Sequence, residues 1–332
     1  MDEKTEQLPL FDADMELESS QPPAPSSVTP ATAAGLKATS PLSTALCAFE
    51  TYMEARRFSA HTRQAFRLDM QLLTEYLNPG VSLGEIGPAH LNAFLIWMRE
   101  QRGVPCNDKT LDRRITTLKV FFGWLVEEKV LERDPAAPLI HREVSTPLPE
   151  VLSEQQIDAL IAVTQGLRAG QGGVRPDVRP HLLVTLLLAT GIKKNECMGI
   201  VLNHLERTDP AQPALWIRYA QRSRRHKERR IPLPVWWPAI LDEYLEQYHP
   251  VEKLFPWTAR NLEYVLTEVG EHAGISHLSF ERLRWTCAVR DWVEGMDPED
   301  LRRKLGLSEV SWYEVEGRLS VLAQRYAQEN RL

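Results

Sequence analysis

Apolar residues recur at helical spacing throughout residues 41–142, and this pattern predicts a unit of four or five helices. Ser59 is placed to cap one helix, in which Phe66, Met70 and Leu73 fall on one side. Asn78-Pro79-Gly80 ends that helix. The other expected helices are Ser43–Glu54, Pro88–Glu100 and a segment after Asn107-Asp108 whose apolar side carries Leu111, Ile115, Leu118, Phe121, Phe122 and Leu125.

Residues 150–332 show a mixed pattern, in which helical periods surround one short region of alternation. Leu215–Tyr219 alternates as a strand does, and Arg229–Leu233 is its expected return strand, because Pro232 suits a sheet edge. The fold class predicted for the chain is therefore mainly α with a small β-ribbon. The expected helices are Glu154–Thr164, a strongly apolar helix from Pro180 to Thr190, Trp236–Tyr248, Arg260–Ala273, Ser279–Glu294, Pro298–Leu305 and Ser311–Asn330.

Residues 1–40 differ from the rest in composition. They are rich in Pro, Ser, Ala and Thr and lack an apolar period, which predicts an acidic, disordered tail. This tail holds seven acidic and two basic residues, so the net charge of −6 leaves only −1 for residues 41–332. A nearly neutral body is compatible with a basic face, because phosphate binding depends on local potential.

The cysteines and the apolar runs narrow the class of protein further. Cys47, Cys106, Cys197 and Cys287 form no CxxC pair, so we expect neither a zinc site nor a disulfide framework, and no other metal or cofactor. The run Leu182–Leu188 is too short to span a bilayer, and the acidic start differs from a secretory leader. We therefore expect a cytoplasmic protein with no membrane partner.

Several segments follow one another in an order typical of one protein family. Leu186–Glu196 is LLLATGIKKNE, Lys227–Leu233 is KERRIPL, and Leu283–Thr286 is LRWT, followed by Gly295 and Leu305-Gly306 at set spacings. Together they resemble the tyrosine recombinase (phage integrase, Xer-like) family. Thr110–Ile115 resembles the SAM-like core-binding domain of that family. The resemblance covers roughly residues 41–320 and implies a SAM-like helical domain at 41–142 and a tyrosine-recombinase-like domain at 150–332.

The resemblance also implies a chemistry, and most residues that this chemistry needs are replaced. Family members attack a phosphodiester with a tyrosine, while two arginines, a lysine and histidines bind the phosphate and move protons. The second arginine is retained as Arg284. The other positions carry Lys193 for the first arginine, Arg224 for the hairpin lysine, Glu281 for the first histidine, Leu307 for the second histidine or tryptophan, and Glu316 for the nucleophilic tyrosine.

These replacements predict a DNA-binding protein that does not cut DNA. Loss of one transition-state donor costs about 3–4 kcal/mol, and loss of the nucleophile costs more. Two alternatives stay open. The chain is an active recombinase that uses a displaced tyrosine, Tyr313 or Tyr326, or it is a protein-interaction module whose C-terminal helix (Ser311–Asn330) docks on a partner or on a second copy.

Double-stranded DNA is the expected partner because basic residues crowd the predicted hairpin, which the family places against the duplex. Such contacts position a protein on phosphates without specifying a sequence. The protein would then be nucleoid-associated. The DNA-binding candidates are Arg222, Arg224, Arg225, Lys227 and Arg229 in the hairpin, Lys194 beside it, and Arg113, Arg114 and Lys119 in the first domain. Three further residues, Arg218, His226 and Arg230, add to the charge of the hairpin.

The amino-terminal tail contains one apolar island. Gln7, Leu8, Leu10 and Phe11 form the segment QLPLF, which resembles the pentapeptide with which bacterial replication and repair proteins bind the DNA sliding clamp. The Gln amide would anchor polar groups while Leu10 and Phe11 fill an apolar pocket. The tail therefore adds the sliding clamp as a candidate partner.

A pull-down with purified sliding clamp tests this candidate. We expect wild-type chain to be retained and the Leu10→Ala/Phe11→Ala variant to be lost, because the apolar anchors supply most of the contact. Equal retention of both proteins would remove the clamp from the list of partners.

Overall fold

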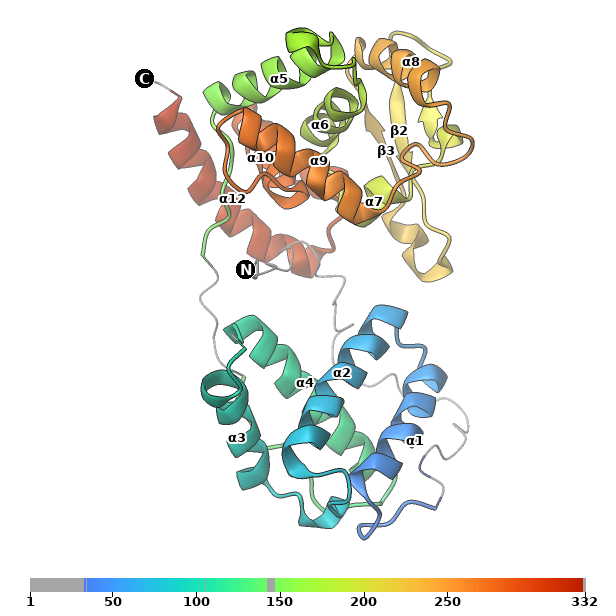
Figure 1. The fold of residues 1–332 in the computed structure, drawn as a ribbon, viewed down its shortest axis with the longest axis vertical. Coiled ribbons are helices and arrows are strands. Elements are labelled where there is room, and N and C mark those ends of the chain that lie inside the picture. The colour runs from blue at the N-terminus through green and yellow to red at the C-terminus, as the bar shows by residue number, and fades with distance from the viewer. Residues whose placement is uncertain (1–32, 34, 105, 142–146, 331–332) are drawn as a thin grey trace. The chain divides into compact units, whose positions relative to one another are not determined.

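The computed structural model describes residue 33 and residues 35–104, 106–141 and 147–330 (Figure 1). The chain forms two compact units that divide between Thr146 and Pro147. The clamp-binding candidates Gln7, Leu8, Leu10 and Phe11 lie outside the described residues. Within the described part of the chain, no helix combines the length and the apolar character needed to cross a membrane.

The first unit is a helical bundle, as the sequence predicts. The side chain of Ser59 accepts a hydrogen bond from the Thr62 amide at 3.0 Å, so this helix start is capped as expected. Asn107 likewise caps a helix, because its side chain accepts from the Thr110 amide at 2.7 Å. Its helices are α1 (Leu42–Ala55), α2 (Ala60–Leu77), α3 (Pro88–Ile96), which continues as a single π-helical turn (Trp97–Gln101), and α4 (Asp108–Glu127).

A buried polar network joins α2 to α4. The Asp69 carboxylate on α2 accepts hydrogen bonds from Arg113 Nη2 and Thr117 Oγ1 on α4, each at 2.9 Å, and lies 3.4 Å from Arg114 Nε. Burial raises the pKa of Asp69, although the two arginines and Thr117 oppose that rise. The network fixes the position of α4 on α2 from inside the unit.

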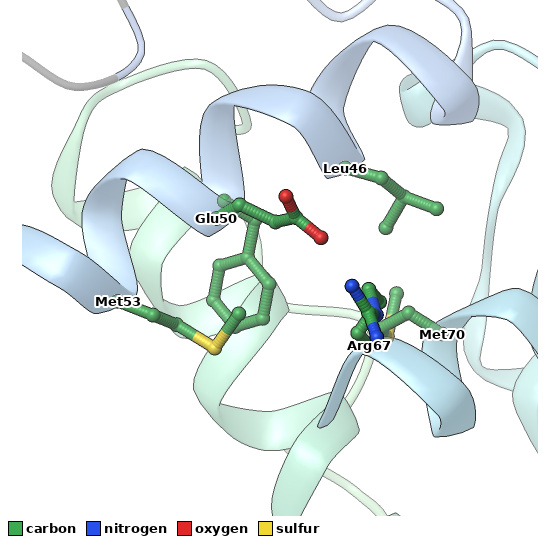
Figure 2. Close-up of a pocket in the computed structure, with 6 residues that line it drawn as sticks. Leu46, Glu50, Met53, Arg67 and Met70 are labelled. Carbon is green, nitrogen blue, oxygen red and sulfur yellow. The ribbon is translucent and has the colours of Figure 1, made fainter. Parts of the chain in front are cut away.

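A shallow hollow lies along the seam between α1 and α2 (Figure 2). Phe49, Met53 and Met70 supply apolar walls, and the Glu50 and Arg67 side chains point toward one another across its opening. Methionine fills irregular gaps between helices well, so the hollow is part of the packing of the first unit.

The second unit is mainly helical and contains one small sheet (Figure 1). Its helices are α5 (Glu154–Arg168), α6 (Arg179–Thr190), α7 (Lys194–Met198), α8 (Trp237–Tyr248), α9 (Ala259–His272), α10 (Phe280–Val293), α11 (Pro298–Leu305) and α12 (Glu309–Glu329). Its strands are β1 (Leu205–Glu206), β2 (Ala214–Ile217) and β3 (Arg229–Pro232).

The sheet is antiparallel in the order β1-β2-β3. Leu215 pairs with Ile231 and Ile217 pairs with Arg229, so the predicted hairpin is confirmed. Pro232 lies on the edge strand, where its missing N–H costs no ladder bond. A 3₁₀ segment, Arg222–Lys227, forms the tip between the two strands. Strand β1 has two residues, too few to give a detectable alternation in the sequence.

Helix α6 is the centre of this unit. Almost all of its side chains are buried, and it packs against α5, α8, α9 and α10, which accounts for its nearly unbroken apolar sequence. Gly191 ends the helix in the left-handed conformation, with φ at 57°. A Cβ at Gly191 would lie 3.1 Å from Cys287 Sγ, so the turn and α10 approach closely. Helix α7 begins directly after this turn.

Helix α12 packs its apolar side on its own unit. Leu319 and Tyr326 are buried in a cluster that α10 and α11 share, and the Trp312 ring lies 6.2 Å from Trp292. The Tyr326 hydroxyl donates to Glu154 on α5. The structure therefore places the apolar side of this helix against the chain itself, and Tyr326 has a structural partner.

Replacement of Asp69 tests how much the buried network contributes to the stability of the first unit. Asp69→Asn is expected to lower the free energy of unfolding by about 3 kcal/mol, because it removes the charge that compensates two largely buried arginines. Urea denaturation of the full chain measures this. Glu54→Gln, which breaks the exposed Arg63–Glu54 pair, is the matched control and should cost less than about 1 kcal/mol. Equal losses of unfolding free energy in the two variants would contradict the conclusion that the buried Asp69 network stabilises the first unit.

Candidate nucleic-acid interface

Arg284, the retained family position, is inside the protein. Its residue is 2% exposed, and it lies on α10 among buried neighbours. One guanidinium nitrogen donates to the Gly191 carbonyl and the other donates to the Leu305 carbonyl at 2.7 Å. Burial lowers the pKa of the guanidinium to about 10, with the Glu196 charge opposing the fall. In this structure Arg284 joins the α6 turn to the end of α11.

Glu196 on α7 is the acidic centre of the same cluster. Its two carboxylate oxygens accept a bidentate pair of hydrogen bonds from Arg229 on β3, each at 2.9 Å, and the Tyr219 hydroxyl also donates to it. Burial disfavours the charged form, but the Arg229 charge and hydrogen bonds outweigh burial and lower the pKa of Glu196 to about 2. Burial and Glu196 together raise the pKa of Tyr219 above its usual value. Tyr219 is therefore a neutral donor here.

Arg229 also fixes the turn that follows α11. Its Nε donates to the Lys304 carbonyl at 2.8 Å. Gly306 has a φ of 62°, and a Cβ there would lie 2.5 Å from Arg229 Nη1. Glycine is therefore required at this turn for two reasons. The backbone has a positive φ, and the Arg229 guanidinium occupies the space of a side chain.

The two lysines after Gly191 are held at the edge of this cluster. Lys193 is buried at the start of α7, and its backbone N–H donates to Glu196 at 2.9 Å. Lys194 is half-buried, and its Nζ lies 2.8 Å from Glu263 on α9. Glu196 therefore accepts from the Lys193 backbone, and the Arg284 charge helps to lower its pKa.

Three other replaced positions lie on α10, on α12 and in the turn before α12. Glu281 is half-buried in the first turn of α10, and Leu307 is buried in the cluster beneath α12. Glu316 lies in the second turn of α12, partly exposed. Tyr313, one turn before it, is 84% exposed. A carboxylate thus stands where the resemblance expects the nucleophilic tyrosine.

The hairpin tip carries the accessible basic charge. Arg222, Arg225 and His226 are exposed, and Arg224 and Lys227 are half-buried. These five residues, which we call the basic tip, occupy a single 3₁₀ segment, so their charges are concentrated at one end of the hairpin. This is the part of the second unit best suited to contact a phosphate backbone.

Two basic residues of the hairpin beside the tip have partners within the protein. Arg218 lies over the Trp216 ring at 5.5 Å, and Arg230 pairs with Glu206 at 2.9 Å. Both residues are exposed at their positions on the sheet. They flank the basic tip, but each already has a partner within the protein.

Three of the predicted DNA contacts, Arg229, Arg114 and Arg113, are held by acidic residues within the protein. Arg229 is paired with Glu196 inside the protein, and Arg114 is buried at 7% exposure beside Asp69. Arg113 is held by the same Asp69, and Lys119 is half-buried on α4. The apolar periods in the sequence indicate that both buried arginines lie on inward sides of their elements. Arg229 shares the inward side of β3 with Ile231. Arg114 follows Leu111 by three positions, and thus shares its side of α4.

Comparison of the sequence with known proteins supplies an independent view. Residues 47–129 match the family model of the phage integrase N-terminal SAM-like domain. The tyrosine recombinase XerC of Staphylococcus haemolyticus is 24% identical over 266 residues, which cover 76% of this chain and 84% of that protein. XerC of Mycobacterium sp. strain KMS is 31% identical over 163 residues, or 48% of this chain and 53% of that protein.

Solved structures show a similar fold. A XerH site-specific recombinase, bound to a palindromic difH substrate in a post-cleavage complex, has a TM-score of 0.65 at 15% identity and covers 86% of this chain and 83% of its own. A lambda integrase dimer bound to a COC′ core site has a TM-score of 0.64 at 14% identity and covers 92% and 84%. At these identities the likeness concerns the fold.

The Glu196 pair predicts a specific dependence of stability on pH. Since the pKa of Glu196 falls from 4.5 to about 2 on folding, its charge stabilises the folded chain above pH 4.5, and that contribution is lost as the pH falls toward 2. Glu196→Gln should therefore be less stable than wild type at pH 7, and the difference should shrink below pH 4.5.

Urea denaturation across this pH range measures the effect. Glu263→Gln, which breaks the more exposed pair with Lys194, is the control and should show a small difference from wild type. A destabilisation by Glu196→Gln that stays constant from pH 7 to pH 3 would contradict the linkage.

Proposed function

Since the chain is homologous to the XerC tyrosine recombinases and has the recombinase–integrase fold, we propose that it binds double-stranded DNA through the basic tip and does not cut it. In this proposal it is an architectural or regulatory factor in DNA recombination or integration. It acts in the cytoplasm, on the nucleoid. Among proteins of similar fold, XerH is bound to a difH substrate, lambda integrase to a COC′ core site and the Tn1549 integrase to a circular intermediate DNA, which supports DNA as the partner.

The observation that carries the proposal is Glu316 at the position of the nucleophile. A tyrosine forms a phosphotyrosine that keeps the energy of the broken bond for rejoining. A carboxylate attacking phosphorus would form a mixed anhydride, which water hydrolyses before the strand is rejoined. Glu316 therefore supplies no useful substitute for tyrosine in strand exchange.

The state of the arginines supports the same conclusion. A phosphate clamp needs guanidinium groups aimed at the phosphate, yet Arg284 donates to two backbone carbonyls and Arg229 is paired with Glu196. Glu281 would add a negative charge where the family has a histidine. These residues stabilise the domain instead of a transition state.

The basic tip suits a positioning role on duplex DNA. Arg222 and Arg225 are exposed, and Arg224 and Lys227 extend the same charge. Each cation that contacts a phosphate releases a counterion, so binding should weaken steeply with salt. Contacts of this kind fix the protein on the backbone, and they leave the base sequence unread.

A displaced nucleophile is the rival function. Tyr313 is the candidate, because it lies on α12 one turn from Glu316 and is 84% exposed. In that case Lys193 and Arg224 would replace the family's arginine and lysine. Tyr326 is a weaker candidate, because its hydroxyl already donates to Glu154.

One pair of assays separates the two functions. With random-sequence duplex DNA, an electrophoretic shift should appear and weaken with salt, and a nicked suicide substrate should trap no covalent complex. Arg222→Ala/Arg225→Ala should weaken the shift by about tenfold or more, because two phosphate contacts are lost. Arg303→Ala, an exposed arginine paired with Glu299 on α11, is the matched control.

Two results would overturn the proposal. Trapped DNA that disappears in Tyr313→Phe would show an active recombinase with a displaced nucleophile. An unchanged shift in the Arg222→Ala/Arg225→Ala variant would show that the basic tip is not the DNA contact.

A further inference from the structure

The acidic residues of the tail are gathered in one stretch of the sequence. Residues 2–18, which we call the acidic segment, hold seven acidic residues and one lysine, a net charge of −6. Residues 19–36 hold no charged residue and include four prolines. The acidic segment precedes the part of the chain that the structure describes. A block of like charge that an uncharged spacer sets apart from a domain is typical of a tail that binds an oppositely charged surface.

The basic tip is a surface of opposite charge. Arg222–Lys227 contains four arginine and lysine residues and no acidic residue. Arg222 and Arg225 are exposed. The carboxylate of the next residue, Glu228, accepts a hydrogen bond from the Tyr219 backbone at 3.0 Å, at the base of the hairpin. The tip therefore presents a concentrated positive potential, and a run of carboxylates is a ligand that matches it.

We propose that the acidic segment binds the basic tip of the same chain and competes there with DNA. A guanidinium group pairs with a carboxylate through the same forked donor geometry that it uses for a phosphate. The same arginines therefore cannot hold both ligands at once. The contact itself is independent of the proposed function, whereas the competition with DNA rests on it.

The point at which the tail joins the first unit is anchored. Ala33 is 6% exposed in the core of that unit, and the Gly84 amide donates to the Ala38 carbonyl at 2.8 Å. Residues 19–32, between this anchor and the acidic segment, span about 48 Å when fully extended. A domain of the size of the second unit has a radius of gyration of about 16 Å. The spacer is therefore long enough to cross such a domain.

The attachment of the segment to the chain sets the strength of this contact. Exposed ion pairs are individually weak, so a free acidic peptide binds the tip poorly. Attachment within one chain raises the effective concentration of the segment to the order of millimolar, which makes a weak contact frequent. Duplex DNA has a higher density of negative charge and displaces the segment. The segment therefore lowers the apparent affinity for DNA several-fold and does not prevent binding.

Chemical labelling of arginine tests the contact in the absence of DNA. The neutralised variant keeps the length of the tail and removes its negative charge through seven substitutions, Asp2→Asn, Glu3→Gln, Glu6→Gln, Asp12→Asn, Asp14→Asn, Glu16→Gln and Glu18→Gln. With phenylglyoxal at low salt, Arg222 and Arg225 should react about threefold faster in this variant, because carboxylates no longer cover them. Arg133, an exposed arginine of the first unit, should react at the same rate in both proteins. Mass spectrometry of the digested chain measures each site.

A second variant separates charge from apolar contact. Leu10→Ala/Phe11→Ala keeps all seven acidic residues and removes the apolar island of the tail. Its labelling rates at Arg222 and Arg225 should equal those of wild type, because the proposed contact depends on carboxylates.

An electrophoretic shift with random-sequence duplex DNA measures the competition. In dilute salt of about 50 mM, the neutralised variant should bind about fivefold more tightly than wild type, because its tip is available more often. At about 300 mM salt the Debye length falls to about 6 Å, and the difference should shrink to about twofold or less. A synthetic peptide of residues 2–18, added at millimolar concentration, should weaken binding by the neutralised variant, and the peptide with the seven substitutions should not.

The outcomes distinguish the contact from the proposed function. Equal labelling of Arg222 and Arg225 in wild type and the neutralised variant would overturn the contact. Equal acceleration at Arg133 would show a general effect of charge and would overturn it as well. Faster labelling of the tip with an unchanged DNA affinity would overturn the competition. Faster labelling without any DNA shift in either protein would support the contact and refute the proposed function.

Discussion

The bidentate pair between Glu196 and Arg229 is the interaction on which the second unit depends. It joins α7 to β3, and Arg229 also donates to the Lys304 carbonyl beside Gly306, while Arg284 bridges Gly191 and Leu305. The α6 turn, the hairpin and the turn before α12 are therefore fixed by one buried cluster. Removal of any charged member would leave another without compensation, and such losses are costly inside a protein.

That constraint assigns internal bonds to Glu196, Arg229 and Arg284. The cluster needs guanidinium and carboxylate groups for internal bonds, and it holds no tyrosine other than the neutral donor Tyr219. The basic tip is attached to the cluster through β3, so its charges sit on a fixed support. The residues of the buried cluster and those of the basic tip are therefore different sets, joined through β3.

Much of this architecture follows from local patterns. The hairpin, the caps at Ser59 and Asn107 and the ends of α11 are predictable, because periodicity, capping and proline placement act over a few residues. Arg229 and Arg114 lie on inward sides of β3 and α4, which the strand and helix periods indicate and basic composition alone does not. The bond between Arg284 and Gly191 joins residues distant in the sequence, so no local pattern reveals it.

The burial of Arg284 has a consequence for how sequences of this kind are classified. An arginine that satisfies two backbone carbonyls contributes to folding, whether or not the protein cleaves anything. Its presence in a newly sequenced genome is therefore poor evidence of an active enzyme. Under the proposed function, Glu316 and Arg224, at the positions of the nucleophile and the hairpin lysine, carry more information about activity than Arg284 does.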